Sequence, residues 1–380
     1  MVKQNPPKAT HHARAFPTRF ATSGARGPHP GELLAFEQPA GDSAMNLGEF
    51  FPASAIKDIQ NHGSISFHAM GDSGVGTQEQ HAVADAMSKD IDTAHHERGP
   101  AFLLHLGDIV YGPDKLAGYA NKFYRPNGNY QNLVFAIPGN HDGEMRSAHD
   151  TSSLQAYFAN FCQPKGKQPA LGSTFGRAMV NQTGAYWRLS CPFVDIVGLY
   201  SNTGENYGSI AHAEFGNAQK VWLAATLSAI AADRKKSRRA LIIAVHHPPY
   251  ASGLKDQSFG HPGNPDMLKD IDDSCTSAAL WPDAVLSAHA HNYQHYERTR
   301  TVKGATQKVP YLVAGGGGIT PQSIPAPIGV AVGDARYVNA AEGNGYLTVT
   351  ASSSQLSFLY TQTHLDHRGV FETFSVPLGK

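Results

Sequence analysis

Five short segments of this chain carry residue types that bind metal ions, and they recur in a fixed order. They read GDSG (71–74), GDIVY (107–111), GNHD (139–142), VHHP (245–248) and AHAH (288–291). Carboxylates, an amide and imidazoles can hold two cations ~3.5–4 Å apart, and such a pair can clamp the oxygens of a phosphoryl group. One Gly-Asp pair after an apolar run is an ordinary strand-to-turn junction. Five such segments in order predict a two-metal phosphoesterase site.

Each of the five segments follows an apolar run that predicts a buried strand. These strands are expected at residues 64–70, 101–106, 133–137, 240–245 and 284–287. Open α/β sheets collect their ligands along the edge formed by the carboxyl ends of the strands. Residues that are far apart in the sequence are therefore expected to converge on one spot.

The remaining pattern alternates helices with strands and then becomes strand-rich. Helices are predicted at 78–93 and 217–232, and further strands at 185–189, 193–200, 310–314, 346–350, 355–360 and 370–376. Residues 143–180, with a helical piece at 154–161, are interpreted as an insertion over the site, and residues 251–275 as a long loop. Four consecutive glycines (315–318) are not followed by Gly-Lys-Ser/Thr, so they predict a tight turn close to other backbone rather than a nucleotide-phosphate loop.

Composition excludes several classes of partner. The 380 residues include 31 basic and 31 acidic ones, which balance to a net charge of +0, so neither nucleic acid nor a membrane surface is expected as a partner. The 20 histidines are unusual and favour a metal site. No apolar run approaches the ~20 residues that span a bilayer. The polar, Pro-rich N-terminal stretch lacks the apolar core of a secretory signal.

These observations lead to a simple organisation. We expect a flexible N-terminal arm at residues 1–45 and a single catalytic domain at 46–380, with the insertion at about 143–180. A cytoplasmic location is expected because no signal is present, or a periplasmic or secreted one if the sequence has been trimmed. The three cysteines lie far apart and predict free thiols rather than a disulfide framework. Nothing in the sequence predicts the oligomeric state.

The five segments resemble those of the calcineurin-like metallophosphoesterases and, more narrowly, those of the purple acid phosphatase branch. The broader superfamily usually begins with Asp-x-His, whereas this chain has Gly74 at the His position and Tyr111 in Gly-Asp-x-x-Tyr. That exchange is typical of the purple acid phosphatases. The resemblance implies a four-layer αββα sandwich of mixed sheets, with the site at the carboxyl ends of the strands. The plant-type members carry an additional β-sandwich, for which the stretch before the first motif strand is too short.

The resemblance also implies two sets of metal ligands. The first ion would be held by Asp72, Asp108, Tyr111 and His291, and the second by Asn140, His246 and His289, with Asp108 bridging. A phenol of pKa ~10 binds well only to a strong Lewis acid, so the first set suits Fe(III). The second set suits divalent Fe, Zn or Mn. The implied reaction is the hydrolysis of small phosphate monoesters, as in acid phosphatases, by in-line attack of a metal-bound hydroxide. For Tyr111, the alternative is a buried core tyrosine.

Two further histidines are expected to contact the substrate. His141 resembles the histidine that assists departure of the leaving group, although it could instead only stabilise a turn. Asp142 stands where many relatives carry Glu and would orient His141. No residue matches the second substrate histidine clearly: His261 is the best candidate and His247 the next. His105, which lies between apolar residues, is predicted to be a core histidine.

Two alternative functions stay open. The same fold serves phosphodiesterases and nucleotide-pyrophosphate hydrolases, which differ in substrate. A chain with a complete ligand set could also be a module that binds metal ions and phosphorylated ligands without hydrolysing them. The natural substrate depends on residues 143–180 and 251–275.

Overall fold

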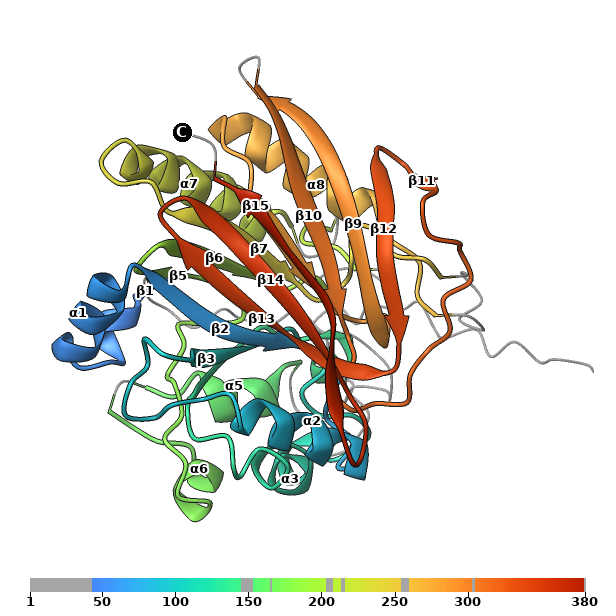
Figure 1. Cartoon of the computed structure of the whole chain (residues 1–380). Helices are drawn as coiled ribbons and strands as arrows, with labels where there is room; N and C mark the ends of the chain where they lie inside the picture. The colour runs from blue at the N-terminus through green and yellow to red at the C-terminus, as the bar shows by residue number, and fades with distance from the viewer. Residues whose placement is uncertain are drawn as a thin grey trace, which may run out of the picture.

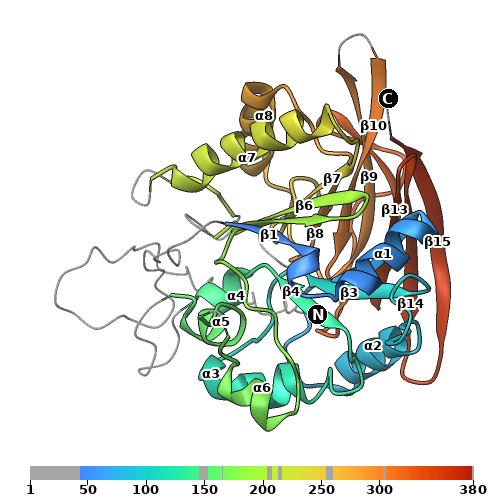
Figure 2. The ribbon, with the colours of Figure 1, turned by 90° about the vertical axis from the view of Figure 1, so that its left-hand side faces the viewer.

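The computed structural model describes residues 43–144, 153–164, 166–202, 208–212, 216–253, 260–302 and 305–378. In this part of the chain two mixed β-sheets face each other, and helices cover their outer faces (Figures 1 and 2). The strand order is β1-β5-β6-β7-β8-β10-β9-β12-β11 in the nine-stranded sheet and β15-β14-β13-β2-β3-β4 in the six-stranded sheet. This arrangement confirms the predicted four-layer αββα sandwich.

Several observed strand bounds agree closely with the apolar runs of the sequence. The nine-stranded sheet contains β1 (Ala44–Asn46), β5 (Trp187–Cys191), β6 (Val194–Leu199), β7 (Ala240–Val245), β8 (Ala284–Ser287), β9 (Asn292–Val302), β10 (Ala305–Ala314), β11 (Ala331–Val332) and β12 (Ala335–Glu342). The six-stranded sheet contains β2 (Ser64–Met70), β3 (Pro100–His105), β4 (Leu133–Ala136), β13 (Asn344–Ser352), β14 (Gln355–Thr363) and β15 (Arg368–Pro377). The predictions for β2, β7 and β8 match these bounds at both ends.

Most of the helices form the two outer layers. They are α1 (Ala53–His62), α2 (Gln78–Ser88), α3 (Lys115–Tyr119), α4 (Asn140–Gly143), α5 (Gln155–Phe161), α6 (Ala170–Thr174), α7 (Ala218–Arg234) and α8 (Pro265–Ala278), with a 3₁₀-helix η1 (Leu47–Glu49) and a π-helix η2 (Ala120–Tyr124). Helices α7 and α8 lie on the nine-stranded sheet, and α2, α3, α5 and α6 lie on the side of the six-stranded sheet (Figure 2).

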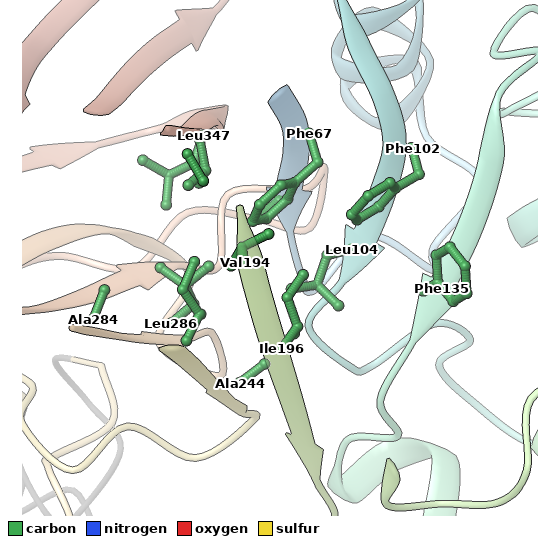
Figure 3. Close-up of a cluster of buried hydrophobic side chains, with 14 of the residues drawn as sticks. Phe67, Phe102, Leu104, Phe135, Val194, Ile196, Ala244, Ala284, Leu286 and Leu347 are labelled. Carbon is green, nitrogen blue, oxygen red and sulfur yellow. The ribbon is translucent and has the colours of Figure 1, made fainter. Parts of the chain in front are cut away.

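Three apolar cores separate the four layers. Between the two sheets, side chains such as Phe67, Leu104, Ile196, Leu286 and Leu347 interdigitate and are almost fully buried (Figure 3). A second core joins the six-stranded sheet to its helices, and a third joins the nine-stranded sheet to α7 and α8. Each large aliphatic side chain buried in this way contributes about 1.5–3 kcal/mol of transfer free energy. Strand β7 is buried along its whole length, which explains why its sequence, ALIIAV, is continuously apolar.

Helix α8 corrects one prediction. The segment 251–275 was expected to be a long loop, but a helix begins at Pro265 and continues to Ala278. The side chain of Asn264 accepts hydrogen bonds from the backbone N–H groups of Asp266 and Met267, and Pro265 occupies the first helical turn. An Asn cap followed by proline is a helix-start signal, and it outweighed the turn signal that proline carries elsewhere.

The described part of the expected insertion is an integral layer of the fold. The helix predicted at 154–161 is confirmed as α5, and the hydroxyl of Tyr157 donates a hydrogen bond to Ala136 O in β4. Phe161 packs edge-on against Phe123, with ring centroids 5.5 Å apart. Helices α5 and α6 therefore pack on the side of the six-stranded sheet. Residues 145–152 and 165 lie outside the described residues.

The N-terminal boundary also differs slightly from the prediction. Strand β1 pairs in parallel with β5, so Ala44 and Met45 belong to the sheet rather than to the predicted arm. Residues 1–42 lie outside the described part of the chain. Among the described residues, no helix is long and apolar enough to cross a membrane. The three cysteines are free, as predicted.

Candidate metal centre

The predicted ligands lie at strand ends from both sheets. Asp72, Asp108 and Asn140 follow β2, β3 and β4 of the six-stranded sheet, while His246 and His289 follow β7 and β8 of the nine-stranded sheet. Because these strands point their carboxyl ends to the same side, the two sheets meet around one cluster of polar side chains. The structure thus brings the five motif segments together, as expected.

Three of these residues have an unusual backbone conformation. Asp72, Asp108 and His289 have positive φ angles of 59°, 54° and 67°. Left-handed conformations are uncommon for residues other than glycine and persist only where the surrounding structure imposes them. At Asp72 the backbone N–H donates to Gly107 O at 3.0 Å, and its carbonyl accepts from Ile319 N at 3.1 Å. Neighbouring strand ends therefore hold this carboxylate in place.

A first group of ligand atoms forms around Asp72. The hydroxyl of Tyr111 donates to Asp72 Oδ1 at 2.9 Å and lies 3.5 Å from His291 Nε2. His291 Nε2 is 3.8 Å from Asp72 Oδ1. The tyrosine hydroxyl thus points into the site, and this position differs from that of an ordinary core tyrosine. These are three of the four residues expected to hold the first metal ion.

A second group forms around His246. Its Nε2 lies 3.1 Å from Asn140 Oδ1 and 3.4 Å from Asp108 Oδ2. Ligand atoms of Asp108, His246 and His289 all lie within 4.8 Å of one another, a spacing that could hold a metal ion. His246 Nδ1 donates to Leu106 O at 2.8 Å, which fixes the ring and turns Nε2 toward the site.

Asp108 connects the two groups. Its Oδ1 accepts a hydrogen bond from the backbone N–H of His141 at 2.9 Å. Its Oδ2 is buried and has no hydrogen-bond partner among the described residues. An unsatisfied buried carboxylate oxygen is costly unless a cation lies against it. The donor set, with this orphaned oxygen at its centre, fits a pair of metal ions that share Asp108.

The pKa shifts of the buried carboxylates and of His246 also indicate that the site favours a bound positive charge. Burial and the nearby charge of Asp108 raise the pKa of Asp72 to about 7. Burial opposes charge on Asp108 as well, but His246 and His141 hold its pKa well below the ordinary range. Burial likewise opposes charge on His246, yet the carboxylates of Asp108 and Asp72 raise its pKa to about 9. A proton on His246 thus supplies the positive charge that a metal ion would bring.

The other imidazoles are prepared to act as neutral ligands. Burial, together with neighbouring imidazoles, lowers the pKa of His289 well below its ordinary value and that of His291 to about 3. Burial and the adjacent carboxylates raise the pKa of Tyr111 well above 10. Its phenol therefore keeps its proton unless a strong Lewis acid displaces it.

The Gly74 position has no room for a side chain. A Cβ placed there would overlap Ile109 O and lie 2.5 Å from Val110 Cα. The carbonyl of Gly74 accepts a hydrogen bond from the backbone N–H of Tyr111 at 2.9 Å. The first motif segment thus packs directly on the loop that carries Tyr111.

The four consecutive glycines lie against the same site. A Cβ at Gly315 would overlap Ala290 O and lie 2.7 Å from Asp72 Oδ2. The N–H of Gly317 donates to Gly71 O at 2.9 Å. These contacts confirm the prediction of a tight turn close to other backbone, which packs the end of β10 on the ligand-bearing loops.

The residues around His141 correct another prediction. Asp142 was expected to orient His141, but its carboxylate instead accepts hydrogen bonds from the backbone N–H groups of Gly139 at 2.8 Å and Ile109 at 3.1 Å. His141 Nδ1 lies 3.1 Å from Glu144 Oε2, and its Nε2 lies 4.0 Å from Asp108 Oδ2. Asp142 therefore shapes the loops, and Glu144 holds the imidazole. An acidic residue three positions after His141 was the sequence signal for this pair, and it was missed.

The two candidates for a second substrate histidine occupy different places. The half-buried ring of His261 stacks on His289 with centroids 3.9 Å apart and lies 5.8 Å from His291, at the site. His247 is fully buried, 4.3 Å from His289, and its Nδ1 lies 2.8 Å from Ser201 Oγ. The ring of His247 is fully buried, so the geometry favours His261 over His247 for direct contact with a substrate. Fully buried His105 bonds Ser73 Oγ at 2.8 Å, as expected of a core histidine.

Comparison with known proteins identifies the family. The family model described as calcineurin-like phosphoesterase matches residues 65–293, which include all five motif segments. The chain belongs to this family of metal-dependent phosphoesterases. No curated protein matches the chain.

Solved structures match the chain at low sequence identity. GAP50, described as the anchor in the inner membrane complex of Plasmodium, matches with a TM-score of 0.59 and 14% identity over 83% of this chain and 90% of its own. PhoD matches with a TM-score of 0.49 and 13% identity over 82% and 69% of the two chains. A single mutant of Vps29 from Entamoeba histolytica matches with a TM-score of 0.28 and 10% identity over 81% of this chain and 100% of its own. At 14% identity, the likeness to GAP50 shows the shared fold alone.

Proposed function

We propose that this protein is a dinuclear-metal phosphomonoesterase of the purple acid phosphatase type. The observation that carries this proposal is the position of Tyr111. Its hydroxyl lies 2.9 Å from Asp72 Oδ1 and 3.5 Å from His291 Nε2. Gly74, where the broader superfamily places a histidine, has no space for a side chain. Tyr111 thus stands in for the missing ligand.

The two groups of ligands suit different metal ions. Asp72, Asp108 and Tyr111 would present hard, anionic oxygens to the first ion, which favours Fe(III). Asn140, His246 and His289 are softer and less charged, which favours divalent Fe, Zn or Mn. When bound, the two ions would acidify a water molecule and neutralise charge on the phosphoryl oxygens.

The residues at the mouth of the site would handle the substrate. His141 is partly exposed and held at Nδ1 by Glu144, so its Nε2 can donate a proton to the oxygen of the leaving group. His261 lies beside His289 and His291, where its ring can contact the non-bridging phosphoryl oxygens. The backbone N–H groups that bind Asp142 and Asp108 keep these loops in register.

The first experiment is the visible absorption spectrum of the aerobically purified protein. A purple tyrosinate-to-Fe(III) band is expected, and Tyr111→Phe should abolish it. Tyr360→Phe is the matched control, because the hydroxyl of Tyr360 is buried with no hydrogen-bond partner among the described residues, so removing it should leave the band unchanged. A colourless protein that is activated by Mn(II) or Zn(II) would refute the iron assignment and leave the phosphatase proposal standing.

The second experiment compares substrates for the metal-loaded protein. A phosphomonoesterase should hydrolyse an aryl phosphate monoester faster than the matching diester or a nucleotide pyrophosphate. The reverse order would identify the phosphodiesterase alternative. Two bound metal ions without hydrolysis of any phosphoester would instead identify the protein as a binding module.

A further inference from the structure

A pocket of about 620 Å³ lies beside the loop that follows the first metal-ligand segment. It is bounded by Gly76 in that loop, His81 in α2, Arg125 just after η2, and Phe175 and Arg177 just after α6. Its volume is within the range of about 300–1,000 Å³ that is typical of small-molecule sites. The described residues that line it include two arginines and no Asp or Glu.

Arg177 brings a positive charge to this pocket, and its partners are neutral. Its Nη1 donates to Asn127 O at 2.9 Å and to Tyr130 O at 2.6 Å, and its Nη2 donates to Asn132 O at 3.1 Å. Its Nε is buried and has no hydrogen-bond partner among the described residues. Burial lowers the pKa of this guanidinium, which shows that the surroundings disfavour the charge.

This arrangement differs from that of three other arginines in the described part of the chain. Arg188, Arg298 and Arg368 lie 2.6–2.9 Å from the carboxylates of Asp195, Asp272 and Asp90. Partly buried cations are usually paired, because an unpaired one is costly. Within the described part of the chain, Arg177 forms no ion pair of this kind.

Two more cations stand close to the pocket. The exposed guanidinium of Arg125 lies over the ring of Phe175, 5.9 Å from its centroid, and forms no ion pair with a described residue. Lys122 lies in η2, which ends just before Arg125, and its Nζ donates to Tyr111 O at 2.7 Å. The charge of this region therefore extends from the pocket to the loop of the metal centre.

We propose that this pocket is a second anion site that binds a phosphate-bearing small molecule. The anion would bind the exposed guanidinium of Arg125 and compensate the charge of Arg177. It could be free inorganic phosphate or the phosphate group of a larger organic molecule. Charge-assisted hydrogen bonds to phosphate are the strongest contacts that guanidinium groups make. This inference goes beyond the proposed function, because the pocket is separate from the metal ligands.

The test uses hydrogen–deuterium exchange of the full chain with its metals, in buffer, with inorganic phosphate, or with phenylphosphonate, which has no ester bond to hydrolyse. Either anion should slow exchange in residues 121–131 and 172–177. Protection by phosphate alone would identify the free ion, and protection by phenylphosphonate alone would identify an organic ligand. Binding at the metal centre is read separately from residues 139–144 and 288–291.

Variants of exposed arginines make the test specific. Arg125→Glu should raise the anion concentration needed for protection at the pocket by about tenfold or more, as expected for a lost charge-assisted contact. Arg336→Glu makes an equal charge change at an exposed position in β12 and should leave the anion concentration needed for protection unchanged. Arg125→Gln serves if the reversed charge impairs folding. Absence of protection with both anions, or equal protection in the Arg125 variants, would overturn the proposal. Neither outcome depends on hydrolysis, so the proposed function is judged separately.

Discussion

Two carboxylates in the segment GNHDGE (139–144) perform different tasks. Asp142 is buried and accepts backbone hydrogen bonds from Gly139 and Ile109, so it joins two ligand-bearing loops. Glu144 is partly exposed and lies 3.1 Å from His141 Nδ1. A carboxylate at Nδ1 keeps a proton on that nitrogen and fixes the ring, which directs Nε2 toward the site. The residue that tunes the histidine is therefore Glu144.

Replacing Glu144 should affect substrates according to their leaving groups. In Glu144→Gln the ring of His141 is held less well, so kcat for phenyl phosphate should fall roughly tenfold to a hundredfold, which is part of the ~10²–10⁴-fold that general acid catalysis typically contributes. The kcat for 2,4-dinitrophenyl phosphate, whose leaving group needs no proton, should change little. Steady-state kinetics with both substrates measures the ratio.

Asp142→Asn is the contrasting variant. It weakens hydrogen bonds to buried backbone N–H groups, so it should lower the free energy of unfolding and reduce activity on both substrates alike. If Glu144→Gln also slowed both substrates equally, Glu144 would have only a structural role.

At the scale of elements, Asp90 joins the C-terminal hairpin to the rest of the six-stranded sheet. It follows α2 and accepts from the hydroxyl of Tyr346 in β13 at 2.5 Å and from Arg368 in β15 at 2.7 Å. His68 Nε2 in β2 lies 3.5 Å away. Burial raises the pKa of Asp90, but these three partners outweigh it and hold the pKa below the ordinary value. One side chain thus ties one helix to three strands.

Asp90→Asn should destabilise the protein in a pH-dependent way. Hydrogen bonds to a charged group contribute about 1.5–3 kcal/mol, so a loss of this order is expected at pH 7. Because the pKa of Asp90 is lower in the folded state, its contribution is present above the unfolded value of about 4 and is lost as the pH falls through the folded value. Urea unfolding at pH 7 and pH 3 should therefore show a large difference between variant and wild type that shrinks in acid.

A nearby aspartate provides the control. Asp92 lies on the same loop, is partly exposed and accepts hydrogen bonds from the backbone N–H groups of Ala94 and His95, so Asp92→Asn should cause a clearly smaller change at pH 7. An equal loss at pH 7 and pH 3 for Asp90→Asn would show that its charge is not the source of the stabilisation.

Elements with simple apolar patterns could be predicted from the sequence, and elements with buried polar residues could not. Strand β7 (ALIIAV) was found because both its faces are buried. Strand β9 (NYQHYERTRTV) was missed because it contains buried polar side chains. Arg298, for example, lies 2.6 Å from Asp272 in α8, a partner that only the folded chain supplies. The convergence of the candidate metal ligands could be predicted because their segments follow apolar strands, whereas the geometry of Glu144 and His261 depends on contacts between segments.

At the scale of the whole molecule, the candidate metal centre lies where the carboxyl ends of strands from the two sheets meet. Ligands from β2, β3 and β4 face ligands from β7 and β8, and the carboxylates of Asp72 and Asp108 are buried between them. Without cations, these charges oppose folding of both sheet edges at once. Metal binding should therefore stabilise the entire sandwich.

Removing the metals should lower the stability of the whole protein. Because the ions bind the folded state, stabilisation of about 4 kcal/mol is expected when free metal exceeds its dissociation constant a thousandfold. Chelation followed by thermal unfolding should show a single transition at a lower temperature, and adding back metal should reverse the change. Asp108→Asn weakens the proposed shared ligand, so chelation should change the thermal unfolding midpoint of this variant much less. If chelation left the thermal unfolding midpoint of the wild type unchanged, bound cations would not be required to stabilise the two sheet edges.

The crowded backbone at Gly74 also constrains how such a site can evolve. A histidine at this position, as in the broader superfamily, would collide with Ile109 O and Val110 Cα in the loop that carries Tyr111. A single Gly74→His change would thus disturb the loop that holds Tyr111, the residue that we propose as the ligand in place of this histidine. Lineages that exchange one ligand for the other must therefore remodel the loop 107–111 in the same step or pass through a form with an incomplete site.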